Sequence, residues 1–361
     1  MTEWNRNHTI DVTLMPKIDL HRHLEGSLRL STLLEIAQKY KLDLPAEDIE
    51  ALRPHVQVTD DPPDHELFLS KFEVLRHFYR SPEIIHRLVY DAVADAAADN
   101  VRYLELRFSP QALSRIRGFP LAEVTDWVID AAQKASRDHQ IQVGLIVTLV
   151  RHDPLEQATQ VAEVAFDRRD KGIVGLDLAG DEIKFPSAPF APIFAEAKQL
   201  GMGITVHAGE WDSAAGVRDA VLHLHADRIG HGVRTVENSH VLRLVRERNI
   251  TFEVCLTSNL QTGVVHQFSH HPLVDMLDLG LAATLNTDDP AVSNCVLSNE
   301  YRIAMDELNL SYADLRLMTL HAARAAFLPD AARQRLVEYF SCQLLEQPGC
   351  NGRPFTLTPT L

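Results

Sequence analysis

Histidines and carboxylates stand in short motifs at widely separated points of this 361-residue sequence, which holds 18 histidines. His21 and His23 are one residue apart, so in an extended chain both imidazoles point the same way and can reach one point. His207, His231 and Asp288 follow much later in the chain. A set of three imidazoles and a carboxylate drawn from these residues suits a borderline-soft divalent ion, and zinc is the first candidate. Zinc with an open position lowers the pKa of bound water to about 7, which provides hydroxide at neutral pH.

The segments that carry these residues are short and apolar, and they alternate with longer helical stretches. We predict strands at Lys17–His21, Arg102–Phe108, Gln142–Leu149, Ile173–Leu178, Gly203–His207, Arg228–His231, Thr251–Leu256 and Ala282–Asn286. Strands alternating with helices predict a parallel sheet with crossover helices. Eight of them in this length predict an α/β fold, a closed (β/α)₈ TIM barrel.

A barrel of this kind carries its functional residues at the C-terminal ends of the strands. The histidine and acid motifs fall at the predicted ends of the first, fifth, sixth and eighth strands. A lone histidine at a strand end is usually a hydrogen-bonded loop residue, and Glu210 alone could be a surface acid. Cys255, at the predicted end of the seventh strand, could be a nucleophile, but free cysteines are mostly small buried residues. Four strand ends that supply one constellation argue against coincidence.

Further helices are expected outside the barrel repeat. The stretch from about residue 30 to 100 is too long for a simple crossover, so we expect a helical lid insertion that caps the C-terminal face. It begins with an amphipathic helix at Ser31–Lys41, in which Thr32 and Glu35 have the spacing of a capping box. A helical C-terminal extension is expected at about 296–345. No Pro/Gly/Ser-rich linker divides the chain, so residues 1–361 are predicted to form a single domain.

The composition excludes several classes of partner. The formal net charge of −15 argues against nucleic acid and against anionic membrane surfaces, both of which need a basic protein surface. No apolar run approaches the roughly 20 residues of a membrane-spanning helix. The N-terminus lacks the apolar core of a signal peptide, and the four cysteines form no CxxC pair. We therefore expect a cytoplasmic protein; its oligomeric state is not indicated by the sequence.

Six motifs in order make the chain similar to the adenosine deaminase family, within the amidohydrolase barrels, over about residues 14–330. Their sequences are Lys17-Ile-Asp-Leu-His-Arg-His-Leu-Glu-Gly26, Glu105-Leu-Arg-Phe-Ser-Pro110, Asp177-Leu-Ala-Gly-Asp-Glu182, Thr205-Val-His-Ala-Gly-Glu210, Arg228-Ile-Gly-His-Gly232 and Asn286-Thr-Asp-Asp-Pro290.

The resemblance implies a zinc ion, one per subunit, and a set of site residues. The implied zinc ligands are His21, His23, His207 and Asp288, and the implied catalytic residues are Glu210, His231 and Asp288. Glu210 would donate a proton to purine N1, which requires a raised pKa or a relayed proton. His231 would orient the zinc-bound water and help to deprotonate it. Asp289 would accept a hydrogen bond involving N7, or would cap a following helix, and the backbone N–H of Gly180 would meet N3.

The lid is implied to cover the substrate. Phe68, Leu69 and Phe72 lie on an apolar helical stripe that resembles the family's lid helix, although such a stripe is also typical of core packing. Glu25 and His23 would lie near the ribose 5′-hydroxyl. Two positions depart from the family pattern: Glu25 stands where an aspartate is common, and His65 stands where a leucine is common. Glu reaches one methylene further than Asp, so recognition of the ribose is the less secure inference.

The implied reaction is zinc-dependent hydrolytic deamination of adenosine and 2′-deoxyadenosine to inosine and 2′-deoxyinosine plus ammonia, as in purine salvage. The same chemistry could act on adenine or on a modified adenosine such as aminodeoxyfutalosine or methylthioadenosine. A catalytically silent binding barrel is disfavoured because every expected site position holds a competent residue. Two-metal hydrolases with a bridging lysine are disfavoured because Asp177-Leu178-Ala179 holds no lysine.

Overall fold

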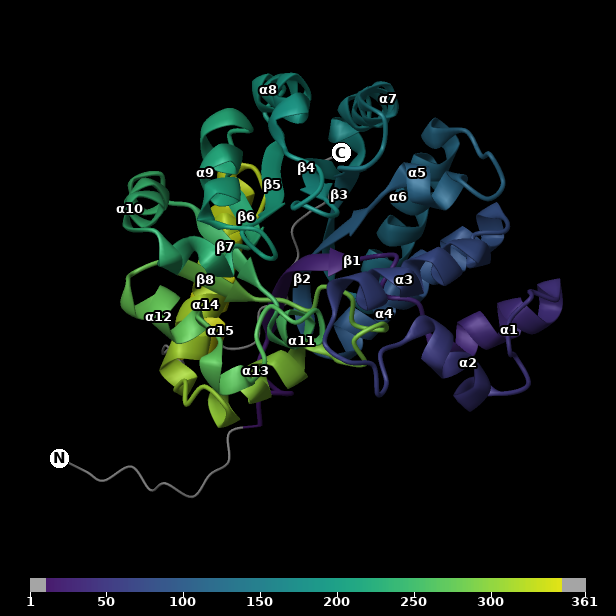
Figure 1. Ribbon diagram of the computed structural model, residues 1–361, viewed down its shortest axis with the longest axis horizontal. Helices are drawn as coiled ribbons and strands as arrows, with labels where there is room; N and C mark the ends of the chain where they lie inside the picture. Colours follow the sequence, from purple (N-terminus) through teal and green to yellow (C-terminus); the bar gives the residue numbers. More distant parts are fainter. Residues whose placement is uncertain (1–10, 346–361) are drawn as a thin grey trace.

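The structure, a computed structural model, describes residues 11–345. Residues 1–10, for which the sequence predicts no signal peptide, and residues 346–361 lie outside the described part. Eight parallel strands form one sheet in chain order (Figure 1). They are β1 (Lys17–His23), β2 (Val101–Phe108), β3 (Gln142–Val150), β4 (Ile173–Ala179), β5 (Gly203–Ala208), β6 (Arg228–His231), β7 (Thr251–Val254) and β8 (Ala282–Leu285).

The sheet closes on itself where the chain leaves β8. Asp288 forms a parallel bridge with Arg22 of β1. The backbone N–H of Asp288 donates to the carbonyl of His21, and the N–H of His23 donates to the carbonyl of Asp288, both at 2.8 Å. The predicted (β/α)₈ barrel is therefore confirmed, and this closure joins two of the candidate metal-binding segments.

The crossover helices surround the barrel (Figure 1). They are α6 (Leu121–His139), α7 (Leu155–Phe166), α8 (Ala191–Gln199), α9 (Ala214–His223), α10 (Ser239–Glu247) and α12 (Leu273–Asp278), with the short helices α5 (Pro110–Ser114), α11 (Leu256–Gln261), η2 (Arg169–Lys171), η3 (Ala188–Phe190), η4 (Val233–Glu237) and η5 (Phe268–His270). Their apolar faces pack on the outside of the strands in one continuous core.

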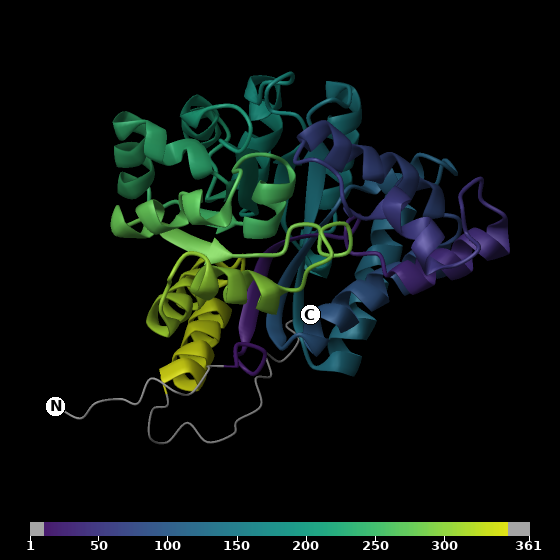
Figure 2. The same cartoon turned by 60° about the horizontal axis from the view of Figure 1, so that its bottom comes forward.

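The two expected helical additions are present. Between β1 and β2 lie α1 (Leu30–Tyr40), α2 (Ile49–Val56), α3 (His65–Leu75), η1 (Arg76–Phe78) and α4 (Pro82–Ala98). After β8 come α13 (Leu297–Asp306), α14 (Tyr312–Ala325) and α15 (Asp330–Leu345). Figure 2 shows α1 to α3 on one side of the upper end of the barrel and α15 at its lower end. The division of the whole chain into one domain stays a prediction.

Several predicted strand ends are shifted by one or two residues, and one predicted cap is wrong. β7 ends at Val254 rather than Leu256, because the Glu300 carboxylate accepts the N–H groups of Leu256 and Thr257, at 2.7 and 3.2 Å, and caps α11. Thr32 and Glu35 do not form a capping box: α1 begins after Arg29 with no side-chain cap. The Thr32 hydroxyl instead donates to Asp91 of α4 at 2.8 Å.

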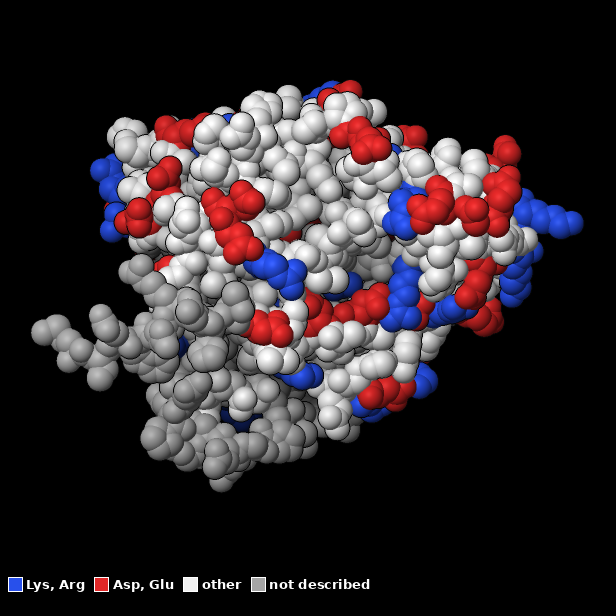
Figure 3. All heavy atoms as spheres, turned by 90° about the horizontal axis from the view of Figure 1, so that it is seen from below, with Lys and Arg blue, Asp and Glu red and all other residues white. Residues whose placement is uncertain are grey.

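The surface mixes charges of both signs. On the face seen from below, Lys and Arg side chains are interspersed with Asp and Glu, and no broad basic field is visible (Figure 3). Among residues 11–345, no helix is both long and apolar enough to cross a membrane.

Phe327, just after α14, packs against the N-terminal ends of the strands, which form the lower end of the barrel. Its ring lies 3.5 Å from the guanidinium carbon of Arg228, and its backbone N–H donates to Glu105 at 2.6 Å. The ring occupies space that only glycine leaves open: a Cβ on Gly203 would lie 2.2 Å from the ring, and one on Gly175 would lie 2.9 Å from it.

We predict that Gly203→Ala lowers the free energy of unfolding by about 1–3 kcal/mol, because the added methyl displaces the Phe327 ring. Urea unfolding measures the effect, with Phe327→Ala as the partner in a double-mutant cycle. In the Phe327→Ala background, the added methyl should cost much less. An equal cost in both backgrounds would show that Phe327 is not the constraint on Gly203.

Candidate active site

The predicted metal ligands converge at the C-terminal ends of the strands, which form the upper end of the barrel. Asp288 Oδ1 lies 3.1 Å from Nε2 of His21 and 3.3 Å from Nε2 of His23. Nε2 of His23 lies 3.2 Å from Nε2 of His207. A tetrahedral metal with bonds of 2.0–2.1 Å separates its ligands by about 3.3 Å. The distances between these donor atoms therefore match the edges of such a coordination shell.

Nε2 of His21 supplies an independent test of that fit. His21 is fully buried, and although Asp288 Oδ1 lies 3.1 Å from this atom, Nε2 forms no hydrogen bond of good geometry among the described residues. A buried, unsatisfied ring nitrogen costs free energy unless a ligand meets it. The donor set of imidazole nitrogens and a carboxylate suits a divalent transition metal, so the residues present fit the metal that the sequence predicts.

Acids behind the histidines orient the rings. Glu253 lies 2.8 Å from Nδ1 of His21, and Asp177 lies 3.0 Å from Nδ1 of His207. A carboxylate at Nδ1 draws the ring proton to that nitrogen and leaves Nε2 free as a ligand. Both acids are fully buried. Asp177 stands in one of the six sequence motifs but was assigned no such role, and Glu253 was not predicted at all.

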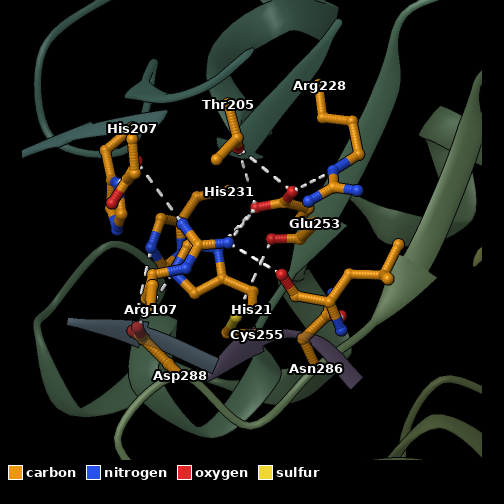
Figure 4. A network of polar contacts seen from close by, with 12 residues as sticks. His21, Arg107, Thr205, His207, Arg228, His231, Glu253, Cys255, Asn286 and Asp288 are labelled. Carbon is orange, nitrogen blue, oxygen red and sulfur yellow. Dashed lines mark hydrogen bonds and ion pairs between the residues drawn. The ribbon is translucent and has the colours of Figure 1, made fainter. Parts of the chain in front are cut away.

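Glu253 is the centre of a buried polar network (Figure 4). Besides His21 it binds Arg107 at 2.8 Å, Arg228 at 2.5 Å and the Thr205 hydroxyl at 3.0 Å. Burial would raise the pKa of Glu253, but the two guanidinium groups hold it well below the usual range. The carboxylate therefore stays charged at neutral pH and keeps its hold on His21.

His231 lies beside the candidate metal ligands. The ligand-type atoms of His21, His207, His231 and Asp288 all lie within 4.8 Å of one another, and those of His23, Asp177 and His207 form another such group. Nε2 of His231 lies 3.7 Å from Asp288 Oδ2 and 3.6 Å from Glu210 Oε2. Nε2 of His231 therefore points toward the carboxyl groups of Glu210 and Asp288.

Glu210 follows β5 on a loop that Glu182 organises. The Glu182 carboxylate accepts the backbone N–H groups of Gly209, Glu210, Trp211 and Asp212, at 2.8, 2.7, 2.7 and 3.1 Å. This places the buried Glu210 side chain beside the candidate metal ligands. Burial, together with the charge of Asp288, raises the pKa of Glu210 well above its usual value. The side chain is therefore suited to carry a proton at neutral pH.

Asp289 turns into the same space. A Cβ on Gly26 would lie 1.9 Å from Asp289 Oδ1, so glycine is required there for the approach. Oδ1 is buried and has no partner among the described residues. Burial and the neighbouring Asp288 raise the pKa of Asp289 well above its usual value. The proposed helix cap is wrong, because no helix begins here: α13 starts at Leu297.

One cavity of about 390 Å³ collects the predicted site residues. That volume suits a small-molecule ligand. Its lining includes every predicted site residue except His21, which is buried: His23, Glu25, Phe68, Leu69, Phe72, Gly180, His207, Glu210, His231, Asp288 and Asp289. Gly180 has a φ of +103°, a backbone conformation that glycine adopts without strain.

The two positions that depart from the family pattern both lie in this lining. Glu25 accepts the backbone N–H of Ser109 at 2.7 Å, and burial raises the pKa of its carboxyl to about 7. His65 of α3 packs its ring 5.0 Å from that of Trp211, centroid to centroid, which joins the lid to the loop that carries Glu210. Cys255 is fully buried, and burial raises the pKa of its thiol, as expected for a packing residue rather than a nucleophile.

A parallel eight-stranded barrel with a buried His/Asp cluster at the C-terminal strand ends is typical of the amidohydrolase class. Residues 16–341 match the family model described as adenosine deaminase. The adenosine deaminase of Edwardsiella ictaluri (strain 93-146) is 41% identical over 321 residues, which cover 89% of this chain and 96% of that protein. The chain belongs to the adenosine deaminase family, whose members are metal-dependent hydrolytic deaminases.

Solved structures with the same fold have related functions. The adenine deaminase of Arthrobacter aurescens superimposes with a TM-score of 0.84 at 26% identity, covering 92% of this chain and 98% of that one. Arabidopsis ADAL, solved in complex with IMP, superimposes with a TM-score of 0.82 at 28% sequence identity, which covers 93% of this chain and 98% of that one. An amidohydrolase from Burkholderia ambifaria, solved with bound Zn, superimposes with a TM-score of 0.80 at 26% sequence identity, which covers 96% of this chain and 97% of that one. Structural neighbours thus bind a metal or a purine nucleotide.

We predict that Glu182→Gln loosens the loop that carries Glu210. Both carboxylate oxygens of Glu182 accept backbone N–H groups, whereas the glutamine amide replaces one of these oxygens by an NH₂ group that cannot accept. The lost charge-assisted hydrogen bonds are worth about 1.5–3 kcal/mol, so amide exchange at residues 209–212 should accelerate roughly tenfold or more. Hydrogen exchange with mass spectrometry measures this. Glu163→Gln, the same change at an exposed position of α7, is the control. Unchanged protection of residues 209–212 would remove Glu182 as the organiser of the loop.

Proposed function

We propose that the protein catalyses hydrolytic deamination of adenosine and 2′-deoxyadenosine to inosine and 2′-deoxyinosine plus ammonia, with one zinc ion per subunit. The observation that carries the proposal is the meeting of the ligand cluster with Glu210 and Asp289 in one cavity. Membership in the family and the 41% identity to an adenosine deaminase support the same substrate.

His21, His23, His207 and Asp288 would hold the zinc ion. The spacing of their donor atoms and the zinc reported for the Burkholderia structure support this choice of metal. A zinc ion in such a site acidifies a coordinated water and so makes a nucleophile available at neutral pH. Glu253 and Asp177 keep two of the ring nitrogens directed at the ion.

Glu210 is the proton donor in this proposal. Addition at C6 of the purine places negative charge on N1, and a proton delivered to N1 neutralises it. A carboxyl with an ordinary pKa would be ionised at pH 7, whereas the raised pKa of Glu210 keeps the proton available. Its Oε2 lies 3.6 Å from Nε2 of His231 in the lining of the cavity, which supports this role.

Asp289 and Gly180 would hold the rest of the base. N7 of a purine nucleoside carries a lone pair and no hydrogen, so a carboxyl that meets it must donate rather than accept. The raised pKa and the unpartnered Oδ1 of Asp289 support that role, which reverses the direction of the hydrogen bond expected from the sequence. The backbone N–H of Gly180 would meet N3.

The lid and Glu25 would recognise the remainder of the nucleoside. Phe68, Leu69 and Phe72 give the cavity an apolar wall that suits a flat base. Glu25 and His23 lie in the lining where the ribose 5′-hydroxyl would be bound. One oxygen of Glu25 already accepts the Ser109 N–H, so its other oxygen is the group left for the hydroxyl.

We predict strong turnover of adenosine and 2′-deoxyadenosine and weak turnover of adenine, because the ribose contributes binding energy through Glu25 and His23. An absorbance assay of the zinc-loaded protein, with adenosine, 2′-deoxyadenosine, adenine, AMP and 5′-modified adenosines in parallel wells, measures this. Turnover of adenine or of a 5′-modified nucleoside alone would overturn the substrate and keep the chemistry. No turnover of any of them would overturn the proposed function.

We predict that Glu210→Gln binds zinc as the wild type does and loses turnover by about 100-fold or more, because a positioned acid contributes 10²–10⁴-fold. Zinc content by atomic spectroscopy and kcat for adenosine are the two measurements. Glu163→Gln again provides the control at an exposed position. A kcat close to that of the wild type would exclude Glu210 as the proton donor.

A further inference from the structure

Behind His231 lies a buried row of hydrogen bonds that leads away from the cavity. Nδ1 of His231 lies 3.1 Å from the side-chain nitrogen of Asn259 on α11. The side-chain oxygen of Asn259 lies 3.1 Å from Nε2 of His271, which follows η5. Nδ1 of His271 lies 3.1 Å from the backbone nitrogen of Leu273. His231, Asn259 and His271 are 1%, 0% and 4% exposed, so the row is shielded from solvent.

The end of the row at Leu273 determines where the protons are. A backbone N–H can only donate, so Nδ1 of His271 is the acceptor. Burial lowers the pKa of His271 to about 3, which keeps the ring neutral at physiological pH. A neutral imidazole carries one proton, and in His271 it must therefore be on Nε2. That N–H donates to the side-chain oxygen of Asn259.

The orientation of the Asn259 amide in turn determines which nitrogen of His231 is the acceptor. Its oxygen already accepts from His271, so its amide nitrogen is the atom that faces Nδ1 of His231 and donates to it. The flipped amide is excluded, because His271 would then accept at both ring nitrogens and would carry no proton. Nδ1 of His231 is therefore an acceptor, and the proton of the neutral ring is on Nε2.

We infer that Asn259 and His271 are positioning residues that hold His231 in the tautomer with the proton on Nε2. In that form the ring presents a hydrogen-bond donor to the reacting oxygen, and it has no lone pair on Nε2 with which to take a proton. The same N–H faces Asp288 Oδ2 at 3.7 Å and Glu210 Oε2 at 3.6 Å. The catalytic part of this inference rests on the proposed function and changes the expected role of His231 from base to donor.

Asn259→Asp is the sharpest test, because it keeps the shape of the side chain and replaces its only donor by an acceptor. A carboxylate at this position accepts from His271 and from His231, which moves the proton of His231 to Nδ1. Asn238→Asp is the matched control: Asn238 is the exposed cap of α10, where its side-chain oxygen only accepts, from the N–H groups of His240 and Val241. A carboxylate can replace it there.

Nitrogen-15 NMR of the histidine rings in the zinc-loaded protein reports the tautomer directly, with His231→Gln used to assign the signal. We expect a bare Nδ1 and a protonated Nε2 for His231 in the wild type and in Asn238→Asp, and a protonated Nδ1 in Asn259→Asp. A protonated Nδ1 in the wild type would overturn the inference, as would an unchanged His231 spectrum in Asn259→Asp. The spectrum needs no substrate, so it decides the tautomer even if the proposed substrate is wrong.

Kinetics separate positioning from a purely structural role. We expect kcat for adenosine to fall about 10- to 100-fold in Asn259→Asp, because His231 loses its donor and a positioned proton-transfer group contributes about 10²–10⁴-fold, with KM and zinc content close to wild type. His271→Gln keeps a donor for Asn259 and should retain most of kcat, whereas His271→Leu should lose it. Equal losses in these two variants at equal thermal stability would overturn the role of His271 as the source of the constraint.

Discussion

The barrel interior holds ionisable groups where a TIM barrel is commonly packed with branched apolar residues, and the Glu253 carboxylate contacts three of them. It meets the guanidinium groups of Arg107 and Arg228 and the ring of His21. Charges that are buried without partners cost several kcal/mol each, so these groups are tolerable only together. Removal of any one partner leaves an uncompensated charge in the core. The orientation of His21 is thus tied to the electrostatic balance of the whole interior.

That balance also connects the two ends of the barrel. Arg228 bonds Glu105 and Glu253 and stacks on Phe327 at the lower end. The proposed metal ligands lie on strands or at strand ends, where the hydrogen bonds of the sheet fix them. Glu210, by contrast, lies on a loop whose conformation depends on the four N–H groups bound by Glu182. Rigid strands therefore set the positions of the proposed metal ligands, while loops and α3 set those of the groups proposed to contact the purine.

Most of the barrel could be predicted because strand periodicity and strand-end motifs are local signals. The prediction failed where a distant residue decided the structure: Glu300 ends β7 early, and Asp91 takes the Thr32 hydroxyl from a cap. The charged residues inside predicted buried strands, such as Glu253, were a visible signal that was not used. His271 carried no such signal, because its role depends on Asn259, which the fold brings beside it.

Neighbouring carboxyls in this site receive opposite protonation states from their surroundings. Burial alone would raise the pKa of Asp288, but the surrounding imidazoles, His21 foremost, hold it well below the usual range. For Asp289 and Glu210 burial is the largest influence, and together with the charge of Asp288 it raises the pKa of both. The ionised group suits a metal cation, and the protonated groups suit ring nitrogens with lone pairs. Adenosine offers such lone pairs at N1 and N7, whereas inosine carries a hydrogen on N1. In the proposed reaction Glu210, once it has given up its proton, can accept that hydrogen, so one carboxyl would bind both the substrate and the product.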